Sequence, residues 1–251
     1  MIVAIVFSGI AWGQQAKADG LTGSAGRGGQ LYRRYCVYCH GPHGDGAGEN
    51  AIYVDPRPRD CTKALFKCRS TASGMLPSDR DLYESITRGF YASGMPSWVA
   101  LTKQQRIDLV AYVKTFSPRF KQESVAAPVT IPAEPASTPQ SVQRGAELFA
   151  KVNCWSCHGK EGRGDGPSAA TLTDSKGNPI RPYDLTGGTR FKCGSSDQEL
   201  YRDLVNGLDG TPMPSFSDAL KPDQIWDVVH YIHTLQHGGT AIVIADSDQD
   251  K

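Results

Sequence analysis

The chain contains one pentapeptide pattern twice, as Cys36-Val37-Tyr38-Cys39-His40 and as Cys154-Trp155-Ser156-Cys157-His158. The pattern C-x-x-C-H is typical of covalent haem c attachment, because two thiols at this spacing reach the two vinyl groups of one porphyrin. The histidine that ends each motif, His40 or His158, is then placed to ligate the iron. The sequence therefore predicts two covalently bound haem c groups.

Cysteine pairs at this spacing also occur in zinc sites and in redox-active disulfides. A zinc site needs a second pair of ligands near each motif, and a thioredoxin-like pair needs a βαβ setting that the sequence does not indicate. The repetition of the whole pattern favours haem over both alternatives.

Further short patterns recur at matching places around the two motifs, which indicates a tandem duplication. The recurring pairs are Gly28-x-x-Leu31-Tyr32 with Gly145-x-x-Leu148-Phe149, Arg57-Pro58 with Arg181-Pro182, Phe66-Lys67-Cys68 with Phe191-Lys192-Cys193, and Asp81-Leu82-Tyr83 with Glu199-Leu200-Tyr201. A chain of 251 residues allows two domains of about 100 residues each plus a connection. We expect domains over residues 19–121 and 141–239, joined by a semi-rigid linker over residues 122–140, which carries four prolines.

Helix signals dominate both halves. Capping-box patterns at Ser78-x-x-Asp81 and Ser196-x-x-Glu199 each predict a helix. A last helix is predicted to begin at Thr102-x-x-Gln105 in the first half and near Pro222 in the second. The apolar residues of this last helix recur at helical spacing, as Leu109, Val110, Val113 and Phe116 and as Val228, Val229, Ile232 and Leu235. The expected fold class is all-α.

The duplication also identifies a candidate for the second axial ligand of each iron. Met95 follows His40 by 55 residues, and Met213 follows His158 by the same 55 residues. Both methionines precede Pro-Ser, and a proline favours an extended backbone at the residue before it, which suits a loop that presents a thioether. Met75 has no counterpart in the second half, so we expect it to fill a gap in the apolar core.

These motifs together resemble class I cytochrome c domains in tandem. The resemblance rests on the Gly-x-x-Leu-Tyr, C-x-x-C-H-Gly and Gly-x-Met-Pro-Ser patterns and on a tyrosine in the last helix, and it covers nearly all of residues 25–120 and 141–237. It implies a small helical fold around each haem, with His/Met ligation at both irons and single-electron transfer. The chain departs from the two-haem class in its long insertions between haem motif and methionine and in its extra cysteines.

His/Met ligation leaves no position for a substrate on the iron, so we expect an electron carrier rather than an enzyme. It would pass electrons between redox partners, such as a respiratory oxidoreductase, another cytochrome or a terminal oxidase, either as a shuttle or as the cytochrome subunit of a complex. The alternative is a dihaem peroxidase-like enzyme in which one iron lacks its sixth ligand. We expect no nucleic-acid partner.

Two arginines and three histidines are further candidates. Arg57 and Arg181 recur at matching positions, and we predict that they bind haem propionates, since arginine makes bidentate hydrogen bonds to carboxylates. The alternative is that they are solvated loop cations. The histidines His230, His233 and His237 share one helical face, which we expect to be solvated rather than to bind a metal.

The N-terminal residues indicate export. An apolar run over residues 2–12 and the A-x-A pattern at Ala16-Lys17-Ala18 resemble a secretory signal over residues 1–18, although no basic residue precedes the run. We therefore expect a periplasmic protein with at most peripheral membrane contact. Residues 240–251 are expected to form an acidic tail.

Three cysteines remain after haem attachment. In an exported protein spare thiols tend to pair, and we predict a Cys61–Cys68 disulfide with Cys193 buried and reduced. A Cys68–Cys193 bond across the two halves is the alternative.

The charge is distributed unevenly between the halves. Lysine and arginine exceed aspartate and glutamate by six over residues 19–121, whereas residues 141–237 carry a net charge of −2. Such a dipole steers encounter, so we expect an acidic partner at the first half. The charges singled out for the two contact surfaces are Lys103, Arg106 and Lys114, and Asp218, Asp223 and Asp227.

Overall fold

The computed structural model describes residues 15–90, 93–188 and 190–239. The first half contains β1 (Lys17–Ala18), β2 (Leu21–Thr22), α1 (Ala25–Tyr35), α2 (Val37–His40), η1 (Ala51–Tyr53), α3 (Asp79–Arg88), α4 (Lys103–Val113), η2 (Lys114–Phe116) and α5 (Arg119–Gln122). The second half contains α6 (Pro139–Lys151), α7 (Trp155–His158), η3 (Ala169–Thr171), α8 (Asp197–Asn206) and α9 (Pro222–Gln236). Helices dominate these elements, so the expected all-α fold is confirmed.

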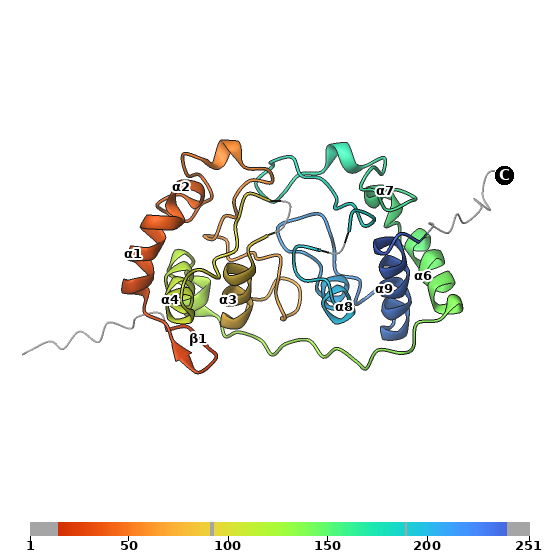
Figure 1. The fold of residues 1–251 in the computed structure, drawn as a ribbon, viewed down its shortest axis with the longest axis horizontal. Helices are drawn as coiled ribbons and strands as arrows, with labels where there is room; N and C mark the ends of the chain where they lie inside the picture. Colours follow the sequence, from red (N-terminus) through yellow and green to blue (C-terminus); the bar gives the residue numbers. More distant parts are fainter. Residues whose placement is uncertain (1–14, 91–92, 189, 240–251) are drawn as a thin grey trace, which may run out of the picture.

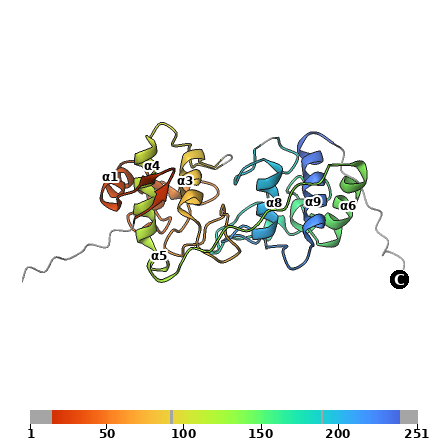
Figure 2. The same ribbon diagram turned by 90° about the horizontal axis from the view of Figure 1, so that it is seen from below.

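The two halves repeat one arrangement of helices. In the first half α1 packs against α4, and in the second half α6 packs against α9. Figure 1 places these pairs at the two outer ends of the molecule, with α3 and α8 toward the junction. The view from below gives the same order (Figure 2). The spatial repeat follows the sequence repeat.

Local sequence sets where the helices begin. Ser78 and Ser196 each accept a hydrogen bond from the backbone N–H three residues later, and the acidic residue there bonds back, which completes a capping box at the start of α3 and of α8. The predicted start of α4 at Thr102 and the first-turn proline of α9, Pro222, are also found. Helix α6 begins at Pro139, inside the segment expected to be linker.

Each outer helix pair crosses at a glycine. A Cβ atom added at Gly28 would overlap the backbone carbonyl of Asp108, and one added at Gly145 would overlap that of Asp227. The same aspartates hold the crossings electrostatically, since the Asp108 side chain is 2% exposed and pairs with Arg27 at 2.7 Å. Asp227 pairs with Arg144 at 2.7 Å in the same way. The recurring Gly-x-x-Leu pattern therefore marks the closest approach of two helices.

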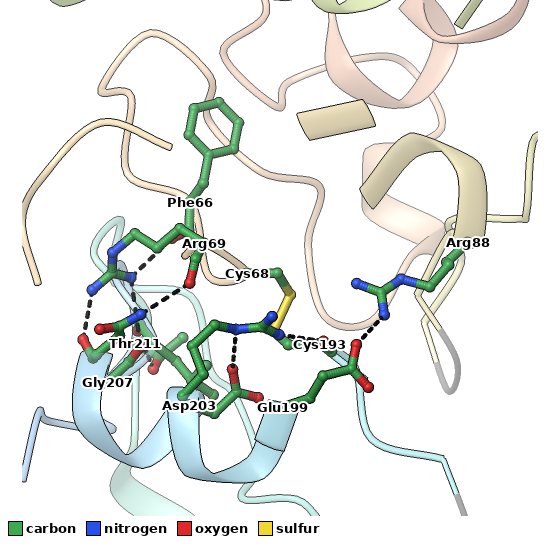
Figure 3. The surroundings of a disulfide bond; sticks show 12 residues. Phe66, Cys68, Arg69, Arg88, Cys193, Glu199, Asp203, Gly207 and Thr211 are labelled. Carbon is green, nitrogen blue, oxygen red and sulfur yellow. Dashed lines mark hydrogen bonds and ion pairs between the residues drawn. A yellow bond between two sulfur atoms is a disulfide. The ribbon is translucent and has the colours of Figure 1, made fainter. Parts of the chain in front are cut away.

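A disulfide joins the halves. Cys68 bonds to Cys193, two cysteines that occupy the same place in the recurring Phe-Lys-Cys pattern. The prediction of a Cys61–Cys68 bond is wrong, because Cys68 points across the junction (Figure 3) and Cys61 is a buried free thiol. The duplication thus pairs equivalent positions of the two repeats.

Arg69, which follows the bridged cysteine, reinforces the junction. Its fully buried guanidinium donates to the carbonyl oxygen of Asn206 at 2.5 Å and pairs with Asp209 at 3.0 Å. Asn206 is the last residue of α8, where carbonyls lack helical partners and a cation is favourable. Figure 3 also shows Arg88 of the first half reaching Glu199 of α8, at 2.7 Å. Two arginines of the first half therefore bind α8, one at its C-terminal end and one through Glu199.

The connection between the halves is attached to both of them. Residues 123–138 contain no helix or strand and run along one edge of the molecule (Figure 1). The backbone N–H of Val129 donates to the carbonyl of Ser70 at 2.8 Å, and Ile131 packs against the core of the second half.

The described N-terminal residues are part of the first half. Ala16 and Ala18 are buried, and β1 pairs with β2. Most of the expected signal sequence, residues 1–14, and the expected acidic tail, residues 240–251, lie outside the described residues. In the described part of the chain no helix has the length and apolar character needed to cross a bilayer.

We predict opposite effects on stability for two alanine substitutions that lie two residues apart on α1. Gly28→Ala forces α1 away from α4 and should lower the free energy of unfolding by about 1–3 kcal/mol, the usual cost of overpacking. Gly26→Ala meets nothing closer than 3.8 Å and should raise it by about 0.5–1 kcal/mol, because alanine favours the helix. Denaturant titration of the purified holoprotein measures both values. Equal effects of the two substitutions would contradict the close crossing at Gly28.

We also predict the disulfide pattern of the purified protein. Digestion without reduction should release one cross-linked peptide pair containing Cys68 and Cys193, and Cys61 should be alkylated when the protein is unfolded. Cys68→Ser should lower stability by about 2–5 kcal/mol, as removal of a native disulfide usually does. Recovery of a Cys61–Cys68 peptide, or alkylation of all three thiols, would contradict this pairing.

Candidate haem sites

Each half encloses one largely apolar cavity on which its chemically distinctive residues converge. The first cavity is lined by Cys36, Cys39, His40 and Met95, together with residues of α3 and α4. The second is lined by the corresponding set, Cys154, Cys157, His158 and Met213. The structure thus brings together all eight residues that the sequence predicted as haem and iron ligands.

The short helices α2 and α7 fix the cysteine-histidine motifs. The backbone N–H of His40 donates to the carbonyl of Cys36 at 2.9 Å, and that of His158 donates to the carbonyl of Cys154 at 2.9 Å. One helical turn therefore presents two thiols and an imidazole to the same cavity. A glycine follows each motif with positive φ, 76° at Gly41 and 80° at Gly159, where other residues are strained.

Backbone carbonyls orient both imidazoles. Nδ1 of His40 lies 3.3 Å from the carbonyl oxygen of Arg59, and Nδ1 of His158 lies 3.0 Å from that of Tyr183. A proton held at Nδ1 leaves Nε2 as the nitrogen with a free lone pair, and such outer contacts are usual for metal-binding histidines. Burial lowers the pKa of both imidazoles, which favours the neutral, ligating form. These carbonyl partners were not predicted, because a backbone acceptor leaves no mark in the sequence.

The two loops that carry Met95 and Met213 make corresponding hydrogen bonds. Each closes on the preceding helix, since Phe90 N–H donates to the carbonyl of Met95 at 3.0 Å and Leu208 N–H to that of Met213 at 3.1 Å. The serine after each Met-Pro anchors the loop, as Ser97 Oγ does by donating to the carbonyl of Thr87 at 2.8 Å. The described parts of the two loops therefore share one hydrogen-bond pattern on either side of the methionine.

Met75 lies outside both cavities and is 46% exposed. The interpretation of Met75 as a core gap-filler is wrong, while its exclusion as a ligand agrees with its position.

The two predicted propionate arginines lie at the cavity walls. Arg57 lines the first cavity and donates to the carbonyl of Ala51, and Arg181 lines the second. Both are exposed. Sequence reasoning missed two further cations, Lys67 and Lys192, each of which lines both cavities. Their recurrence in Phe-Lys-Cys was the available signal.

Acidic residues distinguish the cavities electrostatically, because Asp55, Asp184 and Asp203 line the second cavity and none of them lines the first. Asp203 of α8 lines the second cavity, whereas the matching residue of α3, Ser85, lines the first. The Asp203 side chain is 16% exposed with Arg202 at 3.9 Å, and burial raises the pKa of its carboxyl to about 7. The second cavity therefore carries an ionisable group that the first lacks.

Several residues singled out from the sequence have internal roles instead. Arg106 is buried and donates to the hydroxyl of Tyr83 at 3.0 Å, Lys114 is buried and pairs with Asp79 at 2.6 Å, and Asp227 is held by Arg144. These three charges are not available to a partner, unlike the exposed Lys103, Asp218 and Asp223.

The prediction that His230, His233 and His237 form a solvated face is wrong for His230. His230 is 1% exposed, with Nδ1 3.0 Å from the hydroxyl of Ser141, while His233 pairs with Asp197. No cluster of three or more His, Cys, Asp or Glu suited to a metal ion occurs among the described residues.

The donor sets fit two haem c groups. Each cavity combines two thiols for thioether bonds, an imidazole with Nε2 free, a thioether sulfur and mostly apolar walls.

Comparison with known proteins agrees with this fit. Residues 142–236 match the family described as "Cytochrome c", and residues 23–113 match "Cytochrome C oxidase, cbb3-type, subunit III". The chain is 26% identical over 165 residues to the cbb3-type cytochrome c oxidase subunit FixP of Sinorhizobium medicae, covering 58% of this chain and 52% of that protein.

Two more curated relatives match over shorter stretches. The FixP subunit of Azorhizobium caulinodans is 31% identical, over 42% of this chain and 31% of that protein. The cytochrome bc1 complex cytochrome c subunit of Corynebacterium diphtheriae is 31% identical, over 39% of this chain and 28% of that protein. The chain thus spans about half or less of the length of these relatives.

A solved structure matches nearly the whole molecule. A chain of the Kuenenia stuttgartiensis reducing HAO-like protein complex Kustc0457/Kustc0458 is 40% identical, with a TM-score of 0.81 over 83% of this chain and 95% of that chain. Two cytochrome c domains imply covalently bound haem c. The two family matches, the duplicated cavities and this structural likeness lead to one conclusion: the chain belongs to the c-type cytochromes with two cytochrome c domains in tandem.

Proposed function

We propose that this protein carries single electrons between redox proteins through two haems c, one in each half, as a cytochrome subunit of a redox complex. The observation that carries the proposal is the convergence of two thiols, an imidazole and a thioether on each of two equivalent cavities. When bound, each haem supplies an iron that exchanges one electron between its ferric and ferrous states.

The residues of the chain have defined roles in this proposal. Cys36 and Cys39 would hold the first haem by thioether bonds, and Nε2 of His40 and the sulfur of Met95 would be the ligands of its iron. In the second half these roles belong to Cys154, Cys157, His158 and Met213. A thioether ligand raises the reduction potential relative to harder donors, and apolar walls keep water from the iron.

The peroxidase-like alternative receives less support. It needs one iron with an open sixth position, and both methionine loops have equivalent hydrogen bonds. The relatives are named as subunits of redox complexes, which favours protein partners over a small-molecule substrate.

Export to the periplasm is part of the proposal, as for the exported cytochromes c that the chain resembles. The buried positions of Ala16 and Ala18 and the pairing of β1 with β2 favour a mature protein that keeps these residues, and so count against cleavage after Ala18.

The ligation is tested by removing one methionine at a time. Met95→Ala or Met213→Ala should abolish about half of the weak near-infrared charge-transfer band of Met-ligated ferric haem and lower one of the two midpoint potentials, because a sulfur ligand is lost. Met75→Ala is the matched control, since this methionine lies outside both cavities, and it should leave band and potentials unchanged. If the wild-type protein instead contains one high-spin ferric haem that reacts with peroxide, the peroxidase-like alternative is supported.

The second haem should have a pH-dependent potential. As pH rises through about 7, Asp203 loses its proton, and the new negative charge favours the ferric state, so the midpoint potential of this haem should fall. The slope cannot exceed about 59 mV per pH unit for one proton and one electron. Asp203→Asn should remove most of the pH dependence of this midpoint potential. Asp223→Asn is the control, because Asp223 is exposed on α9, and it should leave the pH dependence unchanged. Potentiometric titration between pH 5 and 9, followed by haem absorbance, measures the slope; an unchanged slope in Asp203→Asn would exclude this group.

A further inference from the structure

Three cations meet where the two cavities adjoin. Lys67 and Lys192 occupy the same place in the two repeats, and each lines both cavities. Arg59 lines the first cavity. Each lysine directly precedes a cysteine of the Cys68–Cys193 disulfide, whose position between the halves is seen in Figure 3. The bond that joins the halves therefore also fixes both lysines at the junction.

These three side chains lack a close ion pair within the described residues, and the carboxylates of Asp55, Asp174 and Asp209 act on them only electrostatically. Neither lysine nor the Arg59 guanidinium makes a hydrogen bond or ion pair to any described group. Cations elsewhere at the junction are paired, as Arg69 is with Asp209 at 3.0 Å and Arg88 is with Glu199 at 2.7 Å. The cluster thus differs from these two arginines at the same junction, which each have a carboxylate partner.

Their surroundings penalise positive charge. Burial, Arg59 and Lys192 together lower the pKa of Lys67 to about 7, and Asp174 opposes this only in part. Burial likewise lowers the pKa of Lys192 and of Arg59. Unpaired like charges in such a place destabilise the fold unless an anion joins them. The cluster therefore has the character of an anion site that faces both cavities.

We propose that Lys67, Lys192 and Arg59 form one anion site shared by the two halves, which binds propionate carboxylates from both haems. The inference rests on the proposed function, since it needs a haem in each cavity. Each haem c brings two carboxylates into an apolar cavity, where a carboxylate requires a cation or hydrogen-bond donors. Arg57 and Arg181, by contrast, each line only one cavity.

A shared site has a consequence that separate sites lack. A positive charge near an iron favours the ferrous state, because it disfavours the more positive ferric form. A lysine that faces both cavities acts on both irons, so its loss should lower both midpoint potentials. A cation confined to one cavity acts mainly on one iron.

The test is a redox titration of four holoprotein variants, each compared with wild type. Lys67→Gln and Lys192→Gln should each lower both midpoint potentials. Lys67→Arg, which keeps the charge, should restore them. Lys63→Gln is the matched control, because Lys63 is exposed and lies only four residues from Lys67, and it should shift neither potential.

The outcomes separate this inference from the proposed function. If each glutamine variant shifts only one potential, or if Lys63→Gln shifts both equally, the shared site is wrong. Loss of haem from Lys67→Gln would leave the decision to Lys192→Gln and Lys67→Arg. The near-infrared band of the same samples reports His/Met ligation independently, so its absence would overturn the proposed ligation whatever the potentials show.

Discussion

Each half of this protein closes its apolar elements around a cavity rather than around side chains alone. With 27 glycines and 16 prolines in 251 residues, the chain has little apolar bulk to build two cores of its own. The outer helix pairs are held in close contact where Gly28 meets the backbone of Asp108 and Gly145 meets that of Asp227. A haem would complete the core of each half, so folding and cofactor retention depend on the same surfaces.

The junction between the halves is the second constraint. A disulfide between equivalent cysteines, a buried arginine that caps α8 and an ion pair from α3 to α8 hold the repeats in one arrangement. This arrangement places two lysines against both cavities. Electron exchange within the molecule and a common electrostatic environment for both irons would follow from that proximity. A duplication joined only by a flexible linker would provide neither.

The sequence was sufficient for the parts that repeat. Matching motifs predicted the capping boxes and the all-α fold, which the structure confirms, and the cysteines, histidines and methionines that the structure brings to each cavity, because each of these is encoded by residues close together in the chain. Contacts between the two repeats could not be predicted from these motifs. Cys61 and Cys68 are near each other in sequence, yet Cys68 bonds across the junction. Arg106, Lys114 and Asp227 were predicted to be surface charges, but all three are buried and contact side chains of their own half. Pairing of that kind depends on tertiary geometry, as does the choice of the Arg59 and Tyr183 carbonyls as imidazole partners.

The central claim is that both cavities are haem sites of one kind. Intact-mass measurement of the purified protein, combined with mass spectrometry of its proteolytic peptides, tests it most directly. The account predicts a mass increased by two haems, with one haem on the peptide containing Cys36 and Cys39 and one on the peptide containing Cys154 and Cys157. A protein that carries a single haem, or none, after expression with a functional haem-attachment system would contradict it.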